Sequence, residues 1–381
     1  MATAPPWSFG LDDDVRGVLV HGLPSATTSW REPLDTARWN HLVAEAARHR
    51  LGGLLVDAVA TGALPTTADQ AAEAAQIEVG LTLARLTYEV HAASILDGLD
   101  RAGVEVRVLK GPALAALDYP DPQWRPSGDL DLLVHGAQLD QAVAALVARG
   151  GVRSDPDPTP GYGAIAGKGA TIEIPDELEV DLHRLLVWGA FGVRTLVDDL
   201  WGPDARSFLL GGVERRALSI EASLLHACYH LVVRGWRRAL TLRDVGQLLA
   251  GATLDEDRTL WLARRWGSEA VLASALLLAQ RELRLAVDGS ILLDWAHGYP
   301  PTVADRLWLR VERPGTRFGP IEAIGAYASL ATADERAVLR RATLHPDPGT
   351  WSSPADRLRH AARRALGPIR DRDRFASPPP R

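Results

Sequence analysis

The chain has 381 residues, enough for two or three domains, and its 46% hydrophobic and 24% charged residues are typical of a soluble globular protein. Its single cysteine excludes an intramolecular disulfide. No apolar run reaches the roughly 20 residues that a membrane-spanning helix needs, so no membrane partner is expected. The net charge of −6 argues against a general affinity for nucleic acid.

The N-terminal segment and the cysteine content both predict a cytoplasmic protein. Residues 1–17 carry acids where a signal peptide would carry positive charge followed by an apolar stretch. A lone thiol is typical of a reducing compartment. Cys228 stands in an apolar helical pattern, and we expect it to be a core residue without a chemical role.

The first region, residues 1–102, is predicted to be helical. Residues 30–62 have apolar side chains at helical spacing and end at a glycine. Thr67 opens a second, longer helix whose alanine-rich composition favours the helical state, and Gly103 ends it.

The pattern changes at residue 103, and residues 103–205 are predicted to form a mixed α/β unit. The strands expected there cover 104–111, 129–135, 170–175 and 178–183, the last two paired as a hairpin. A short helix over 111–119, a proline-rich turn over 120–128 and an amphipathic helix over 138–151 separate them.

Residues 206–350 are predicted to form a C-terminal helical domain, because strand patterns disappear from about Val213. Successive helices are expected over 219–235, 242–251, 257–267 and 269–283. The region from about Pro300 is predicted to be helical with turns, and residues 351–381 to be an arginine-rich helix with a disordered tail.

The strongest chemical signal is a pair of aspartates, Asp129 and Asp131, at the start of the second predicted strand. Side chains alternate between the faces of a strand, so both carboxylates point one way while Leu130 and Leu132 point into the core. Two acids on a solvated face are the alternative interpretation. On a half-buried face their repulsion is costly, and a divalent cation removes that cost. Mg²⁺ suits the pair because it takes carboxylate oxygens and completes its octahedron with water and phosphate.

A third acid follows about fifty residues later, in Glu179-Val-Asp181-Leu-His183. If this strand lies beside the first, Asp181 completes a three-carboxylate site. Such a site holds two metal ions about 3.5–4 Å apart, one activating the attacking hydroxyl and the other bracing a triphosphate. Glu179 and His183 share the face of Asp181, and we expect them to support the metal ligands.

The turn after the first predicted strand, Lys110-Gly111, predicts a phosphate-binding seat, because a helix N-terminus and an ammonium group meet there. Arg125 and Ser127, just before the aspartate pair, are expected to contact the β and γ phosphates. Only two of the 42 basic residues are lysines. We infer that Lys110 stands where a compact ammonium is needed and a planar guanidinium would not fit.

These motifs resemble the DNA polymerase β superfamily of nucleotidyltransferases, which has a glycine-containing strand–helix turn, a strand with D-x-[DE] and a third acid on a later strand. More narrowly, LKG, RPSGDLDLLV and EVDLH are similar to the bacterial, largely uncharacterised nucleotidyltransferase family with K-G, R-x-x-D-x-D-L-L-[VI] and a later D-L-H. Arg125 stands one residue further from Asp129 than that pattern gives. Pro112 follows Gly111 where the wider superfamily has Ser or Gly. The resemblance covers roughly residues 100–250.

The resemblance implies an α+β fold, in which a polymerase β-like core of a short mixed sheet with flanking helices lies between an N-terminal helical segment and a C-terminal helical bundle. Asp129, Asp131 and Asp181 match the catalytic metal ligands, and Lys110 and Gly111 the turn. The family also has a helical region with histidines and an aspartate after an arginine, which matches His226, His230, Arg243 and Asp244. We expect His230 and Asp244 to support the site.

The function implied is metal-dependent transfer of an NMP from an NTP, with ATP favoured as donor and Mg²⁺ or Mn²⁺ as cofactor. The acceptor stays open, and a hydroxyl on a small molecule, peptide or protein is favoured over RNA because the chain is acidic. Two alternatives also stay open. One is a non-catalytic nucleotide-binding module of the same fold. The other is a toxin-like nucleotidyltransferase that modifies tRNA, which two arginine-rich segments, 234–243 and 357–374, permit.

Overall fold

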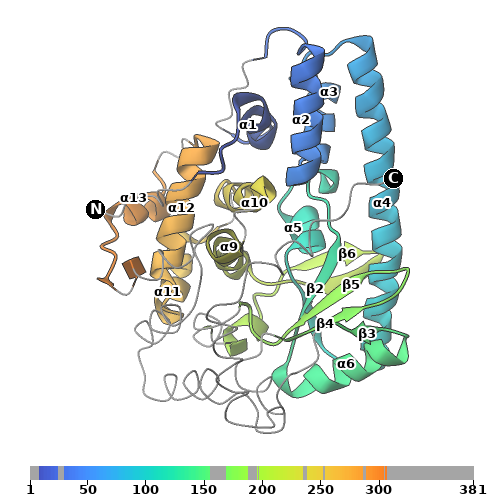
Figure 1. The fold of residues 1–381 in the computed structure, drawn as a ribbon. Helices are drawn as coiled ribbons and strands as arrows, with labels where there is room; N and C mark the ends of the chain where they lie inside the picture. The colour runs from blue at the N-terminus through green and yellow to red at the C-terminus, as the bar shows by residue number, and fades with distance from the viewer. Residues whose placement is uncertain are drawn as a thin grey trace, which may run out of the picture.

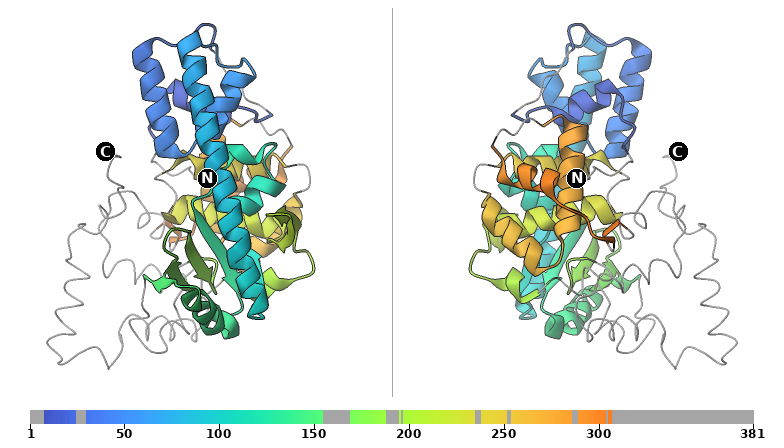
Figure 2. Two further views of the ribbon diagram at one scale, coloured as in Figure 1. Left: turned by 90° about the vertical axis from the view of Figure 1, so that its right-hand side faces the viewer. Right: turned by 90° about the vertical axis from the view of Figure 1, so that its left-hand side faces the viewer.

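The fold combines a mixed sheet, a long helix across it and two groups of helices (Figures 1 and 2). The computed structural model describes residues 8–24, 30–154, 169–187, 195, 197–234, 238–251, 254–285, 289–303 and 305–306. The predicted arginine-rich helix and tail at 351–381, and most of the helical region expected after Pro300, lie outside these residues.

The N-terminal region is helical, as the sequence predicts. Its helices are α1 (Asp13–Val20), α2 (Thr36–His49), α3 (Gly52–Ala60) and α4 (Ala68–Arg101). The long helix α4 begins with a capping box, in which the Thr67 hydroxyl accepts from the Gln70 N–H and the Gln70 side chain accepts from the Thr67 N–H. Gly103, with a φ of 72°, ends α4 as predicted.

The helical pattern over 30–62 forms two separate helices, α2 and α3, with a break at Arg50. Arg50 adopts the left-handed conformation, with φ 59° and ψ 40°, and its backbone N–H donates to the carbonyls of Ala46 and Ala47. Glycine is the residue that helices favour at such an end, and another residue costs roughly 1 kcal/mol more. Periodicity alone could not predict the break, since apolar spacing continues through it.

The sheet of the α/β unit has five strands in the order β1-β2-β5-β4-β3. They are β1 (Val106–Val108), β2 (Asp129–Val134), β3 (Val152–Arg153), β4 (Gly169–Glu173) and β5 (Glu179–His183). Strand β2 is antiparallel to β1 and parallel to β5, and β4 and β5 form the predicted antiparallel hairpin. Helices α5 (Gly111–Leu117) and α6 (Leu139–Ala148) follow β1 and β2 as predicted. The predicted α+β class is confirmed.

One face of this sheet packs on α4 and α6. Leu130, Leu132 and Val134 of β2 are completely buried in a cluster with α4 side chains such as Ile95 and Leu96. Figure 2 shows α4 running across the sheet. The predicted alternation of β2 is therefore confirmed for the leucines, and the aspartates lie on the opposite face.

A second, two-stranded sheet corrects the expectation that strands disappear from about Val213. Strands β6 (Ser207–Leu210) and β7 (Val213–Arg216) form an antiparallel hairpin. Its turn is Gly211-Gly212, with φ values of 60° and 79°. Two central residues of positive φ make the turn type that two-residue hairpins prefer, so the Gly-Gly pair was the signal for this hairpin.

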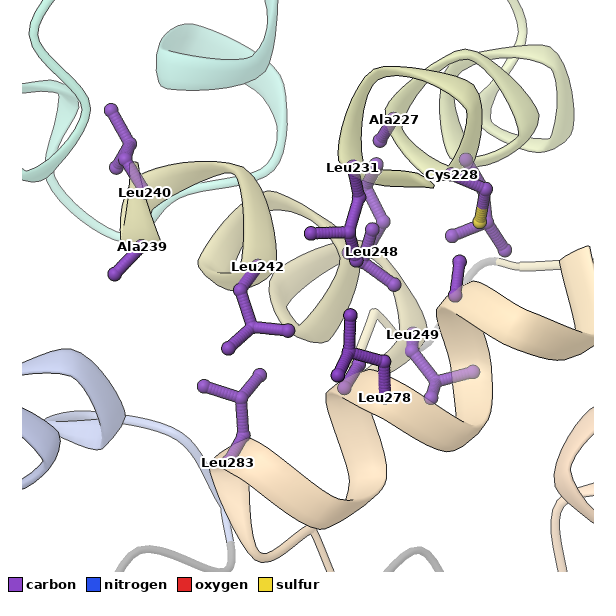
Figure 3. Packing of buried hydrophobic residues seen from close by; sticks show 14 of the residues in the cluster. Ala227, Cys228, Leu231, Ala239, Leu240, Leu242, Leu248, Leu249, Leu278 and Leu283 are labelled. Carbon is purple, nitrogen blue, oxygen red and sulfur yellow. The ribbon is translucent and has the colours of Figure 1, made fainter. Parts of the chain in front are cut away.

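Four C-terminal helices lie where the sequence predicts them, and a further helix over Ile291–Gly298 was not predicted individually. They are α9 (Ile220–Tyr229), continued by a π-helical turn over His230–Arg234, α10 (Ala239–Leu249), α11 (Glu256–Arg265), α12 (Glu269–Leu283) and α13 (Ile291–Gly298). Leu242 and Leu248 of α10 pack towards Leu278 and Leu283 of α12 (Figure 3). Cys228 is fully buried in the same cluster, as expected.

One hydrophobic cluster joins the N-terminal and C-terminal helices. Leu19 of α1, Leu42 of α2 and Leu54 of α3 share it with α10 and α12, whereas most buried side chains of α4 and the five-stranded sheet form a second cluster. The two helical regions predicted as separate thus have a common core in three dimensions. The limits 1–102, 103–205 and 206–350 stay predictions. Among the described helices, none combines the length and apolar character that crossing a bilayer requires.

His49 joins the end of α2 to the start of α10. Its Nδ1 accepts a hydrogen bond of 3.0 Å from the Ala239 N–H, and the residue is 1% exposed. Burial lowers the pKa of His49 to about 4, and the charge of Arg48 acts in the same direction. The imidazole is therefore neutral in the folded protein at neutral pH.

We expect this histidine to make the fold sensitive to acid. Since the unfolded chain takes up the proton near pH 6.5 and the folded protein near pH 4, the free energy of unfolding falls by about 3 kcal/mol between these values. Urea unfolding measured across that interval checks this. His49→Asn, which keeps an acceptor and does not titrate, should lose less stability than the wild type, and equal losses would contradict the assignment.

Candidate active site

Five polar side chains share one face of the parallel pair β2 and β5. The register sets Asp129 opposite Glu179, Asp131 opposite Asp181, and Leu133 opposite His183. Because residues two apart on a strand lie on the same face, the acids of β2 and the three polar residues of β5 are neighbours. The condition that the sequence prediction made for Asp181, a place beside the first acidic strand, is met.

Three of these residues bring donor atoms close together. One ligand atom each of Asp131, Asp181 and His183 lies within 4.8 Å of the others. Two carboxylates with an imidazole form a donor set that fits a divalent cation such as Mn²⁺ or Mg²⁺. Asp129, at the first position of β2, is not among the three. Its predicted role as a metal ligand stays a prediction.

Asp131 is the most enclosed of the acids, at 3% exposed. Its Oδ1 lies 2.8 Å from the Lys110 ammonium and 2.9 Å from His183 Nε2. Asp181 is half-buried, and its Oδ1 accepts a hydrogen bond of 2.6 Å from the Thr171 hydroxyl on β4. The carboxylates are therefore oriented by neighbours before any ligand binds. Sequence reasoning missed Thr171, although the hairpin register opposite Asp181 could have indicated it.

The turn after β1 has an unusual backbone. Lys110, which caps α5, has φ 47° and ψ −134°, a region that residues other than glycine rarely adopt. Backbone strain of this kind costs about 1–3 kcal/mol and is concentrated at functional sites. At Gly111, an added Cβ would lie 2.8 Å from the Ser127 hydroxyl oxygen, so only glycine lets Ser127 approach the turn. Lys110, Gly111 and Ser127 thus lie together, as the prediction of a phosphate seat requires.

Arg125 has a partner that the sequence prediction did not give it. Its Nε and Nη2 donate to the two carboxylate oxygens of Asp244 at 3.0 and 2.9 Å, and Nη1 donates to the carbonyl of Pro126. The Tyr119 hydroxyl donates to Asp244 at 2.7 Å. Burial lowers the pKa of Arg125, but the charge and hydrogen bonds of Asp244, together with the charges of Tyr119 and Asp129, outweigh burial and raise this pKa. The predicted contact of Arg125 with phosphate stays a prediction, and in the described structure this side chain joins the loop before β2 to α10.

A pocket lies between α5, α9 and α10, next to the acidic face. Its polar wall consists of Lys110, Ser223, His226, His230, Thr241 and Asp244. Burial lowers the pKa of His226 well below its usual value, the charge of Lys110 adds to this, and the imidazole is neutral at neutral pH. The rings of His226 and His183 lie 6.4 Å apart. The predicted His230 and Asp244 thus line a pocket that Lys110 connects to the acidic face.

Glu179 lies at the exposed edge of the acidic face. Partial burial raises its pKa, and the charges of Asp181 and Asp129 raise it further.

Arg50 is a second residue that sequence reasoning missed. Its guanidinium lies against Gly128, directly before Asp129. Arg50 lies between two helices, and nothing in the sequence around it indicates a contact with Gly128.

A family model described as uncharacterised nucleotidyltransferase matches residues 35–284, which extends the predicted resemblance into α2 and as far as α12. Two solved structures of the antibiotic-resistance factor ANT(2″)-Ia are similar, each at 18% identity and a TM-score of 0.34. The solution structure matches over 48% of this chain and 93% of that chain, and the crystal structure with adenylyl-2″-tobramycin over 47% and 97%. A comparison with curated proteins gives no match. Since the family model covers well over half of its length, the chain belongs to the uncharacterised nucleotidyltransferase family.

Proposed function

We propose that the protein is a metal-dependent enzyme that moves an NMP, with AMP favoured, from an NTP to an acceptor hydroxyl and releases pyrophosphate. The acceptor hydroxyl would belong to a small molecule, a peptide or a protein. The observation that carries the proposal is the meeting of Asp131, Asp181 and His183 on one sheet face in a chain of this family. A cytoplasmic location fits a chain with a single cysteine that uses NTP.

Asp131 and Asp181 would hold the metal, with Asp129 as a further ligand at the edge of the face. A divalent cation bound there would neutralise charge on the phosphates and favour ionisation of the acceptor hydroxyl. His183 would orient Asp131 through its hydrogen bond of 2.9 Å. Mg²⁺ suits the carboxylates, and the nearby imidazole also suits Mn²⁺.

The chain's own cations would position the triphosphate. In the reaction the acceptor oxygen forms a bond to the α-phosphorus, the bond from that phosphorus to the bridging oxygen breaks, and pyrophosphate leaves. The hydroxyl proton passes to a carboxylate or to water. Lys110, held 2.8 Å from Asp131, would stabilise negative charge on the phosphates, and Ser127 beside Gly111 would bind a phosphate oxygen. The nucleotide would lie between the sheet and helices α9 and α10, along the pocket that includes Lys110.

The test is ATP binding by calorimetry with Mg²⁺, with Mn²⁺ and with EDTA. We expect metal-dependent binding by the wild type and at least a tenfold weaker affinity in Asp129→Asn/Asp131→Asn, because the phosphates then lose their metal. Thermal unfolding of both proteins checks that the variant is folded. Wild-type binding that is equally tight in EDTA would favour the non-catalytic module. Binding of tRNA with a steep salt dependence would favour the tRNA-modifying alternative.

A further inference from the structure

Arg50 stands at a position where the backbone favours a different residue. It ends α2 in the left-handed conformation, with φ 59°, and glycine satisfies such an end best. Gly128 shows the reverse. An added Cβ there would lie 3.0 Å from Arg50 Nη2 and 3.5 Å from Nη1 and Cζ, so the guanidinium takes the space of a side chain. The lack of a side chain at Gly128 makes room for the Arg50 guanidinium, which therefore lies next to Asp129.

The guanidinium of Arg50 is half-buried, yet among the described residues none accepts a hydrogen bond from it or forms an ion pair with it. The charges that act on it are those of Arg238, Asp129 and Arg125. Burial lowers its pKa, Arg238 lowers it further, and Asp129 opposes them. A guanidinium has five N–H donors, and leaving them without acceptors is costly when the group is partly buried.

Arg238 reaches the same region from α10. It is the residue before the helix, it is exposed, and the next residue, Ala239, donates its N–H to His49, the neighbour of Arg50. One hydrogen bond thus holds together the two chain segments that carry the two arginines. Arginine side chains held near one another bind phosphate through charge-assisted hydrogen bonds.

We propose that Arg50 and Arg238 bind the β and γ phosphates of the nucleotide donor, opposite the Lys110 turn. This inference rests on the proposed function and deepens it. The loop before β2 connects the two cationic segments, because Ser127 lies against Gly111, which follows Lys110, and Gly128 lies against Arg50. Phosphates next to Asp129 and its metal would then receive charge-assisted hydrogen bonds from Arg50.

The experiment uses Arg50→Gly, a change that the backbone favours. We expect the thermal midpoint to stay equal or rise, because glycine relieves the left-handed conformation. Affinity for ATP and for inorganic tripolyphosphate, measured by calorimetry with Mn²⁺, should fall at least about tenfold, while affinity for AMP stays unchanged. Arg238→Ala, at an exposed position, should weaken tripolyphosphate binding about threefold.

Arg284→Gly is the matched control. Arg284 ends α12 in the same left-handed conformation, with φ 52°, and it pairs with Asp13 of α1. Its replacement should affect the thermal midpoint as Arg50→Gly does and leave ATP binding unchanged. If Arg50→Gly binds tripolyphosphate with wild-type affinity, or loses affinity for AMP and ATP equally, Arg50 does not bind the phosphates. Either result overturns this inference and leaves the proposed function standing. If the wild type binds neither ATP nor tripolyphosphate, the proposed function fails together with this inference.

Discussion

Replacing Asp181 with asparagine is expected to lower the rate of nucleotidyl transfer by about 10³-fold or more while the thermal midpoint changes little. Asp181 is half-buried, and its Oδ1 accepts a hydrogen bond of 2.6 Å from the Thr171 hydroxyl on the neighbouring strand. Asparagine keeps an oxygen that accepts this bond. It removes the negative charge that a metal ligand needs, so the loss falls on chemistry and not on folding.

The measurement is pyrophosphate release from each NTP with the acceptor that the wild type uses. Before that acceptor is known, Mn²⁺ binding by calorimetry gives the same comparison. Asp140→Asn is the matched control, because Asp140 is an exposed carboxylate in the first turn of α6, away from the acidic face. Asp140→Asn should behave like the wild type. A wild-type rate for Asp181→Asn would remove Asp181 from the site.

Asp131 is the less suitable residue for this test. From sequence, two neighbouring aspartates on a half-buried strand are expected to repel each other, and the loss of one would relieve the fold. In the structure Asp131 is held by Lys110 and His183, at 2.8 and 2.9 Å. Its removal would leave the Lys110 ammonium, only 14% exposed in its side chain, without a counter-charge. Asp131→Asn is therefore expected to cost stability as well as activity.

The acidic face could be predicted from sequence because it depends on local rules. Alternation along a strand sets Asp129 and Asp131 on one face, and the same rule groups Glu179, Asp181 and His183. The strands themselves were visible from their apolar runs. Their parallel pairing, which brings Asp131 opposite Asp181, depends on how the chain between them crosses the sheet. Residue spacing carries no information about that crossing.

The contacts of the cations could not be predicted, since each joins segments far apart in the chain. Arg125 and Asp244 are separated by 119 positions, and the Ala239–His49 hydrogen bond, which joins the segments that carry Arg50 and Arg238, spans 190. No local rule selects such partners. Arg50 is hidden for a different reason, because its place beside Gly128 follows from a left-handed backbone angle that an arginine in the sequence does not indicate. The hairpin β6–β7, in contrast, had a local signal in Gly211-Gly212.

Replacing Asp244 with alanine is expected to lower the free energy of unfolding by about 3–5 kcal/mol. Arg125 is 8% exposed and Asp244 is 4% exposed, and two hydrogen bonds of 3.0 and 2.9 Å join them. Without Asp244, the buried guanidinium loses its counter-charge and the Tyr119 hydroxyl loses its acceptor. Urea unfolding at neutral pH measures the loss. Asp13→Ala, which breaks the exposed pair with Arg284, is the control and should cost at most about 1 kcal/mol.

The double variant Arg125→Met/Asp244→Leu then separates two roles of Arg125. The double variant removes both charges, so no buried charge is left without its counter-charge. Most of the unfolding free energy lost in Asp244→Ala should therefore return. If Arg125 serves to hold the loop before Asp129 against α10, the double variant binds ATP with nearly wild-type affinity, because apolar packing keeps the loop in place. If Arg125 leaves Asp244 to bind phosphate, as the sequence motif suggests, ATP affinity falls about tenfold in a protein of restored stability. The bidentate pair favours the first outcome. Both carboxylate oxygens of Asp244 already accept hydrogen bonds from Arg125, and a phosphate would have to displace Asp244 from it.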